Sequence, residues 1–186
     1  MKKLFVLIIF LIFFSSAAVS FAKDSTKEDT SVSTPSSNKT IDYTLPYPGL
    51  LPDNPLYILK AISDRIVETL ISDPVKKANF ELLQSDKRLN EGFFLFKKGE
   101  SKYALGESTI SKGENYFEKG IAEIEKAKKQ GMDLSGTTQR FYLSSLKQRE
   151  ILKGLINKSR GDIKQRLQAD DKRMEEFEKK LKPVSS

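Results

Sequence analysis

Few side chains in this sequence are suited to catalysis or metal binding. The chain of 186 residues contains no His and no Cys. Most zinc, copper and haem sites need one of these residues as a ligand, and many nucleophilic dyads and triads need one as base or nucleophile. No Asp-rich calcium loop is present either. We therefore expect no metal, no cofactor, and no catalysis by imidazole or thiolate.

Two other arrangements could in principle support hydrolysis. Ser144 and Lys147 have the S-x-x-K spacing of exported penicillin-recognising enzymes, but the S-D-N and K-T-G elements that accompany it are missing. Neighbouring acids such as Asp170 and Asp171 could serve glycoside hydrolysis only if both faced one cleft, and adjacent helical residues point about 100° apart. We predict that the protein is not an enzyme. A hydrolase using carboxylates or a Ser/Lys pair is the less favoured alternative.

The N-terminus has the layout of an export signal. Lys2 and Lys3 precede an apolar run, Leu4–Phe14, and small residues follow up to Ala22. The run is too short to span a bilayer of about 30 Å at about 1.5 Å per residue. We predict a signal peptide over residues 1–22, cleaved between Ala22 and Lys23, with an uncleaved anchor as the alternative. The protein should then be extracytoplasmic, that is secreted, periplasmic, or tethered to the membrane and facing outward.

The segment after the signal should be a linker. Residues 23–42 hold nine Ser or Thr and only two aliphatic side chains. Such a composition cannot bury enough apolar surface to offset its ordering entropy, so we expect disorder there. Residues 43–182 are long enough for one domain with its own core.

Hydrophobic periodicity and start signals predict an all-α domain, a bundle of about four to five helices. A Pro-rich strap over 43–54 should precede helices at 55–72, 74–98, 101–130, 137–158 and 161–182. Asp53 or Asn54 can cap the first helix, with Pro55 in its first turn. Five apolar residues of that helix fall on one face: Leu56, Leu59, Ile62, Ile66 and Leu70.

A seven-residue repeat of glycine dominates the middle of the chain. Glycines recur at Gly92, Gly99, Gly106, Gly113 and Gly120, and a large side chain follows the last four of them by four residues. This alternation of small and large positions predicts helices packed very close together. A single helix of some fifty residues is one reading. We favour a long antiparallel hairpin with its bend at Gly99, since interior glycines destabilise a helix by about 1 kcal/mol each unless close packing compensates.

The Pro-rich strap is the candidate interaction surface. It combines three tyrosines and several aliphatic residues with a stiff backbone. Structurally it should cover the helical core, and functionally it could dock a partner. Its candidate residues are Tyr43, Leu45, Pro46, Tyr47, Pro48, Gly49, Leu50, Leu51, Pro52 and Tyr57.

The net charge of +7 is concentrated near the C-terminus. Residues 137–186 carry thirteen basic against seven acidic side chains. This excess could attract an anionic lipid or an acidic polymer. Favourable pairs four residues apart, such as Glu175 with Lys179, favour an ordinary solvated helix face instead. We expect no nucleic-acid partner.

Several motifs together resemble a known bacterial family. The segment Y-T-L-P-Y-P-G-L-L-P-D-N-P-L-Y begins at Tyr43, Asp73-Pro74 and Lys76-Lys77-Ala78 follow, and then comes Lys87-Arg88-Leu89. Over roughly Tyr43 to Ile156 the chain is similar to domain-of-unknown-function family 5667. The resemblance implies an exported or membrane-tethered helical protein with no established activity, so it assigns no functional residue. The glycines of the third helix depart from the family pattern, in which alanine is expected.

Taken together, these features predict an uncharacterised helical module of the cell envelope that binds or scaffolds without catalysis. Its partner would be an envelope protein or an anionic polymer or lipid, and an uncleaved N-terminal segment would add membrane contact. The alternative is a protein that associates with the membrane surface through its basic C-terminal helix.

Overall fold

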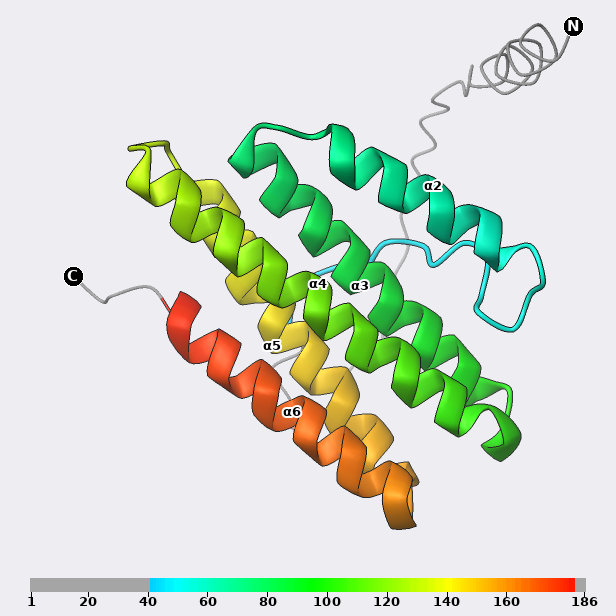
Figure 1. The fold of residues 1–186 in the computed structure, drawn as a ribbon. Helices are drawn as coiled ribbons and strands as arrows, with labels where there is room; N and C mark the ends of the chain where they lie inside the picture. Colours follow the sequence, from blue (N-terminus) through cyan, green and yellow to red (C-terminus); the bar gives the residue numbers. More distant parts are fainter. Residues whose placement is uncertain (1–40, 183–186) are drawn as a thin grey trace, which may run out of the picture. The chain divides into compact units, whose positions relative to one another are not determined.

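Five α-helices follow one another along residues 41–182, the part of the chain that the computed structural model describes. No strand occurs in that part, so the prediction of an all-α bundle is confirmed. The helices, numbered as in Figure 1, are α2 (Tyr57–Leu70), α3 (Pro74–Lys97), α4 (Tyr103–Lys129), α5 (Ser135–Lys158) and α6 (Gly161–Leu181). The predicted signal peptide over 1–22, its cleavage site at Ala22 and Lys23, and residues 23–40 of the predicted linker lie outside the described residues.

The glycine repeat forms an antiparallel hairpin of α3 and α4, as predicted. The reading as one long helix is wrong, because α3 ends at Lys97 and a 3-10 turn over Glu100–Lys102 leads into α4. Gly99 makes the bend with φ of 109°, a conformation that favours glycine. Across the bend the rings of Phe96 and Tyr103 lie 4.5 Å apart and fix the start of α4.

The glycines let the two arms of the hairpin approach closely. A Cβ atom added to Gly92 would lie 2.6 Å from the carbonyl oxygen of Gly106 and would also clash with Ile110. A Cβ at Gly113 would lie 2.9 Å from the Cβ of Arg88. The seam between α3 and α4 therefore depends on small residues, as the heptad pattern indicates.

Three helices start two residues away from their predicted positions; one of them is α4, which begins at Tyr103 rather than 101 because the 3-10 turn over Glu100–Lys102 precedes it. Asp73 caps α3 as expected, accepting a hydrogen bond from the Lys76 backbone N–H at 2.8 Å. Helix α2 begins at Tyr57, two residues after the predicted start at Pro55. Helix α5 begins at Ser135 rather than 137, because the Asp133 side chain accepts hydrogen bonds from the backbone and hydroxyl of Ser135.

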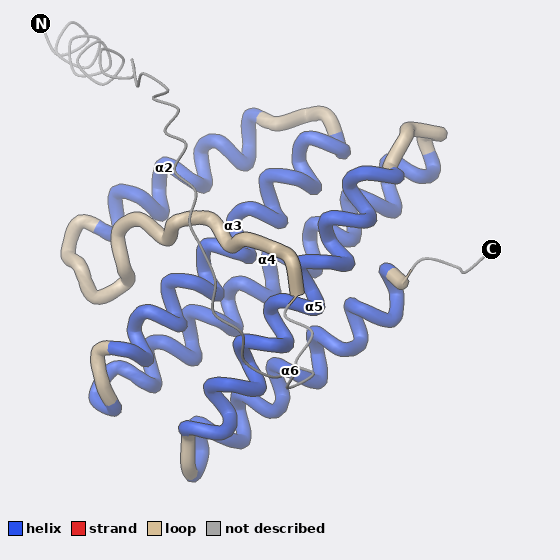
Figure 2. Tube along the Cα trace, turned by 180° about the vertical axis from the view of Figure 1, so that it is seen from behind, coloured by secondary structure: helices blue, strands red, loops and turns tan. Residues whose placement is uncertain are grey.

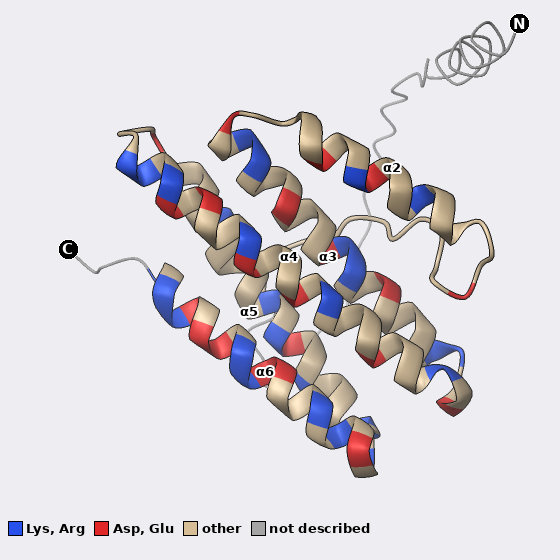
Figure 3. Cartoon of the chain, in the orientation of Figure 1, with Lys and Arg blue, Asp and Glu red and all other residues tan. Residues whose placement is uncertain are grey.

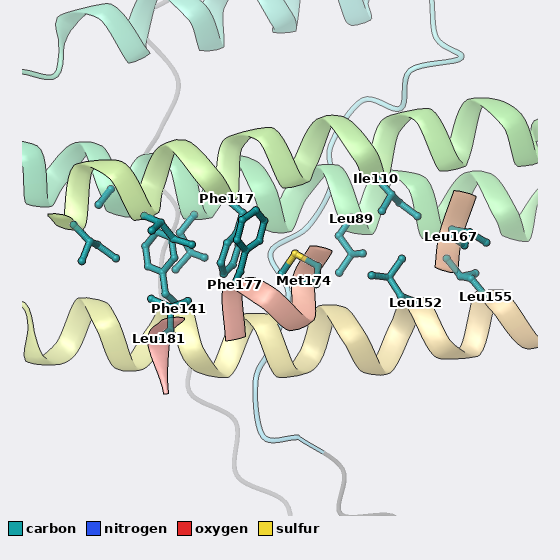
Figure 4. Packing of buried hydrophobic residues seen from close by; sticks show 14 of the residues in the cluster. Leu89, Ile110, Phe117, Phe141, Leu152, Leu155, Leu167, Met174, Phe177 and Leu181 are labelled. Atoms are coloured by element: carbon teal, nitrogen blue, oxygen red, sulfur yellow. The ribbon is translucent and has the colours of Figure 1, made fainter. Parts of the chain in front are cut away.

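Helices α5 and α6 complete the apolar core by packing on the hairpin. At its centre the ring of Phe117 lies 5.1 Å from that of Phe141 and 5.5 Å from that of Phe177 (Figure 4). Met174 is fully buried beside this group, and Leu152 is fully buried further along the core, near Leu155 and Leu167. The apolar stripe of α6 therefore packs inside the bundle.

Helix α2 lies at one edge of the bundle, with α6 at the opposite edge (Figure 1). Its apolar stripe does share one face, but that face points to solvent rather than toward the core. We call the following six side chains the outer face of α2; each is between 42% and 75% exposed: Ile58, Leu59, Ile62, Ile66, Val67 and Leu70. The opposite side of the helix, which contains Lys60, Asp64 and Glu68, lies toward α3 and α4. The helix is therefore polar inside and apolar outside.

Candidate functional site

The first residues of the strap are fixed to the bundle by a buried polar network. The Tyr43 hydroxyl donates to one carboxylate oxygen of Asp86 at 2.6 Å, and the Ser144 hydroxyl donates to the other at 2.6 Å. Gln148 donates from its side-chain amide to Asp86 and to Ser85, at 3.1 Å each. Burial raises the pKa of Asp86, although these hydrogen bonds act in the opposite direction. The network ties the strap to both α3 and α5.

The rest of the strap divides into packed and exposed residues. The strap runs across the back of the bundle toward α2 (Figure 2). Leu45 packs against the core, Pro48 is buried, and the Pro46 carbonyl accepts a hydrogen bond from Asn90 at 2.9 Å. Only two of the predicted strap residues have large apolar side chains that are well exposed, Tyr47 at 81% and Leu50 at 40%. Gly49 makes the turn between them at φ of 75°.

The end of the strap reaches the contact between α2 and the hairpin. Leu51 and Pro52 are half-buried, and Asn54 closes a turn by donating its backbone N–H to the Leu51 carbonyl at 2.9 Å. The Tyr57 hydroxyl donates to the Glu91 carboxylate at 2.7 Å. Tyr57 is therefore drawn inward, away from the outer face of α2.

Ser144 and Lys147 do not form the hydrogen bond that a Ser/Lys pair would use. The Ser144 hydroxyl donates to Asp86, whereas the Lys147 ammonium lies 3.1 Å from Glu150. Asp171 pairs with Arg149 at 3.0 Å, while its neighbour Asp170 is buried on the other side of α6. Ser144, Lys147 and Asp171 are thus occupied in structural contacts, whereas Asp170 has a buried carboxylate oxygen with no hydrogen-bond partner among the described residues.

Charged side chains join α2 to the hairpin. Glu91 is fully buried on α3 and accepts from both Lys60 and Arg88, each at 2.8 Å. Lys119 of α4 lies 2.7 Å from Glu68 of α2. Burial raises the pKa of Glu91, and the two cations that contact it act in the opposite direction. An ionised Glu91 is matched by these cations, so α2 is held by ion pairs rather than by apolar packing.

A cavity of about 440 Å³ lies between α2 and α4. One face of α4 lines the cavity with residues at helical spacing. The rest of the lining comes from α2, from Arg88 of α3 and from Pro52 of the strap. No Asp or Glu is among the lining residues, which are Pro52, Tyr57, Ala61, Arg65, Arg88, Leu105, Thr109, Lys112, Asn115, Tyr116 and Lys119. Its volume is within the range of small-molecule sites. Such a cavity can bind an anion, but it offers no carboxylate as a general base.

Three acidic side chains with strongly raised pKa values lie elsewhere in the bundle. Burial raises the pKa of Glu114 to about 9, with the Asp170 carboxylate adding to the shift. Burial also raises the pKa of Asp170 and of Glu81 to about 7. None of the three lines the cavity. Within residues 41–182 no group of three or more acidic side chains is arranged to hold a metal ion.

Two predicted strap residues, Pro52 and Tyr57, line the cavity, but none of the lining residues on α4 was predicted, although a signal for them was present. Leu105, Thr109, Lys112, Tyr116 and Lys119 follow one another at spacings of four, three, four and three, which defines one face of α4. The glycine repeat on another face of the same helix is the stronger pattern. The face with Lys112 and Lys119 therefore reads as an ordinary solvated surface.

Comparisons with known proteins identify the family. Neither the curated proteins nor the solved structures gave a match. The model of the family described as domain of unknown function (DUF5667) matches residues 49–183. The match extends past the predicted limit at Ile156 to include α6, and it begins within the strap. Because it spans well over half of the chain, the protein belongs to the DUF5667 family.

Proposed function

We propose that the protein is a non-catalytic binding module of the cell envelope and that it binds the surface of a lipid bilayer through the outer face of α2. The observation that carries this proposal is the reversed polarity of that helix. A continuous exposed apolar patch of several hundred Å² marks a site of interaction in soluble proteins. The polar side of α2 is occupied by ion pairs with Glu91 and Lys119, so the apolar side is the one left for a partner.

The composition of the outer face favours lipid over a protein partner. All six side chains are Ile, Leu or Val, whereas the residues that dominate protein interfaces are mostly Trp, Tyr and Arg. Lipid chains require no matching shape, and a helix of about 21 Å can lie flat in the interfacial layer. No helix within residues 41–182 combines the length and apolarity needed to cross a bilayer. Surface binding is therefore the form of membrane contact that suits α2.

Net charge does not by itself select α2 as the membrane-binding helix. Residues 41–182 contain 27 Lys and Arg against 22 Asp and Glu, and the positive excess, which favours an anionic membrane, lies in residues 137–182. The predicted export signal and linker would keep the domain close to a membrane if the signal stayed uncleaved.

The C-terminal helix suits lipid insertion less well than α2. The apolar residues Leu167, Met174 and Phe177 of α6 are buried in the bundle. Basic and acidic side chains alternate along the rest of this helix (Figure 3). Arg149, for example, lies 2.7 Å from Glu178 and 3.0 Å from Asp171. The charges of α6 are therefore largely neutralised by neighbouring side chains of opposite sign, so this helix has little free charge with which to attract a membrane.

Vesicle co-sedimentation tests the proposal. The chain starting at Lys23 contains the whole described domain with its own core, and vesicles of phosphatidylglycerol and phosphatidylcholine supply the surface. We expect Ile62→Ser with Ile66→Ser to weaken binding by at least about tenfold, because two side chains lose their apolar contact with lipid. The matched control is Leu83→Ser with Phe94→Ser, which changes two partly exposed side chains of α3 and should leave binding unchanged.

Two results would contradict this function. Equal binding to vesicles by the α2 variant and the wild type would show that α2 does not contact the bilayer. Sedimentation equilibrium that gives a dimer for the wild type and a monomer for the α2 variant would identify a second copy of the chain as the occupant of the outer face.

A further inference from the structure

The cavity between α2 and α4 is lined by four cationic side chains and no anionic one. Arg88 comes from α3, Arg65 from α2, and Lys112 and Lys119 from α4. Three separate helices thus place positive charge around one half-open cavity. This arrangement is independent of the outer face of α2, which lies on the opposite side of that helix.

Arg88 is a buried, positioned cation in this cavity. The residue is 5% exposed, and its guanidinium group lies 5.0 Å from the ring centre of Tyr57 and 5.8 Å from that of Tyr116. Its Nη1 donates to Glu91 at 2.8 Å, and its Nη2 is 3.9 Å from Asp64, too far for a hydrogen bond. A guanidinium carries five N–H donors. Among the described residues it makes one hydrogen bond, so donors remain for a ligand.

The local charge balance leaves an excess of positive charge. Five cations surround the cavity and its floor: Lys60, Arg65, Arg88, Lys112 and Lys119. The carboxylates that pair with them are Asp64, Glu68 and Glu91. Arg65 and Lys119 share the single carboxylate of Glu68. Lys112 lies within salt-bridge distance of no acidic side chain in residues 41–182. The cations therefore outnumber the carboxylates that pair with them by two.

We propose that this cavity binds a phosphate group carried by a small organic molecule or by a lipid headgroup. A phosphate monoester carries up to two negative charges, which equals the excess, and Arg with Lys is the usual donor set for phosphate. The rings of Tyr57 and Tyr116, with Leu105 and Pro52, offer an apolar wall to the organic part of the ligand. Arg88 forms the fixed contact, and the exposed rim cations Arg65, Lys112 and Lys119 close over the anion.

Titration with glycerol phosphate, followed by amide chemical shifts, tests the site. We expect saturable shifts confined to α2, to the part of α4 from Leu105 to Lys119, and to the turn of α3 around Arg88. Lys112→Gln should weaken binding by about tenfold, since one charge-assisted hydrogen bond is lost. The control Lys129→Gln removes the same charge from the exposed end of the same helix and should change nothing. Both lysines are exposed, so neither variant should disturb the fold.

Competition distinguishes the two sources of phosphate. Vesicles of phosphatidic acid, whose headgroup is a phosphate monoester, would assign the site to a lipid headgroup if they displace glycerol phosphate, and to a soluble ligand if they leave its shifts unchanged. The proposal is wrong if no saturable shifts occur with either probe, or if Lys112→Gln and Lys129→Gln weaken binding equally. The variant with Ile62→Ser and Ile66→Ser should still bind glycerol phosphate, so this site and the bilayer contact of α2 can fail separately.

Discussion

Helix α3 makes two contacts of opposite character, one with α4 and one with α2. Toward α4 it presents glycine and large apolar residues, and the two backbones approach until a single Cβ would clash. Toward α2 it presents Arg88 and Glu91, which are buried and paired. The first contact is apolar and close, whereas the second depends on charge. The same helix thus joins the core on one side and holds a polar attachment on the other.

This difference explains why the apolar side of α2 can stay exposed. Burying an ion pair yields little net stability, because desolvation of both charges offsets their attraction. A helix held in this way does not need its apolar residues for attachment. The hairpin supplies the stability of the domain, and α2 is left to present a surface.

The largest expected effect comes from comparing one apolar residue in each region. Leu82→Ala in the core should lower the free energy of unfolding by about 2–5 kcal/mol, because a fully buried side chain leaves a cavity. Ile62→Ala on the outer face of α2 should lower it by less than about 0.5 kcal/mol. Urea unfolding measures both. A loss above about 2 kcal/mol for Ile62→Ala would mean that this face is covered in solution.

A second comparison concerns glycines inside helices. Gly92→Ala should lower the free energy of unfolding by about 1–3 kcal/mol, because the new methyl group meets the Gly106 carbonyl oxygen and Ile110. Gly154→Ala on α5, where nothing lies within 4 Å, should raise it by up to about 1 kcal/mol through helix propensity. Thermal unfolding of the two variants gives the sign directly. Stabilisation by Gly92→Ala would contradict close packing of the hairpin.

The hairpin could be predicted from sequence because two independent signals agreed. The glycine repeat gave the contact face, and the turn around Gly99 gave the bend, so the observed seam follows the predicted one. The repeat alone does not indicate the contact that Gly120 makes. The nearest neighbour of Gly120 is Phe141 of α5 rather than a residue of α3. Long-range contacts of this kind depend on where α5 is placed, which local pattern does not determine.

The orientation of α2 could not be predicted in the same way. Its apolar residues recur at helical spacing and read as a packing face, and charged residues are rarely buried. Yet Glu81, Gln84, Arg88 and Glu91 recur on α3 at spacings of three, four and three, and all four are buried. A polar stripe on α3 that matches Lys60, Asp64 and Glu68 on α2 was the available signal. This polar stripe did not lead to the correct orientation of α2, because a charged stripe on a helix usually faces water.

A third prediction uses pH to separate buried carboxyls from surface ion pairs. Glu114 is 1% exposed, and burial raises its pKa from 4.5 to about 9, so the folded protein holds it protonated near pH 7. Its 3.3 Å contact with Arg173 is then a hydrogen bond to a neutral group. The protonated Glu114 contributes its full stabilisation below pH 4.5, the pKa of an ordinary Glu. This contribution is lost progressively as pH rises from 4.5 to about 9, the pKa in the folded protein. The slope is on the order of 1 kcal/mol per pH unit for one such group.

Glu114→Gln should therefore flatten the fall of the melting temperature between pH 6 and pH 9. Glu118→Gln is the matched control, because Glu118 contacts the same Arg173 but is largely exposed. Groups whose pKa is lowered, such as Asp53 and Glu175, titrate below this range. An unchanged slope in Glu114→Gln would show that this carboxyl is ionised in the folded state.

The smallest expected effect is that of salt on the attachment of α2. Raising NaCl from 0.05 to 1 M shortens the Debye length to about 3 Å and screens partly exposed pairs such as Lys119 with Glu68. Each such pair contributes about 0.2–1 kcal/mol, so amide hydrogen exchange in α2 should speed up by a few fold. Exchange in the α3–α4 seam should slow or stay unchanged, because salt does not weaken apolar packing. Lys119→Gln should abolish part of the salt response in α2 and leave that of α4 near Gly113 as it was. If salt slowed exchange equally in both regions, α2 would be held by apolar contacts like those of the hairpin, and the contrast between the two faces of α3 would disappear.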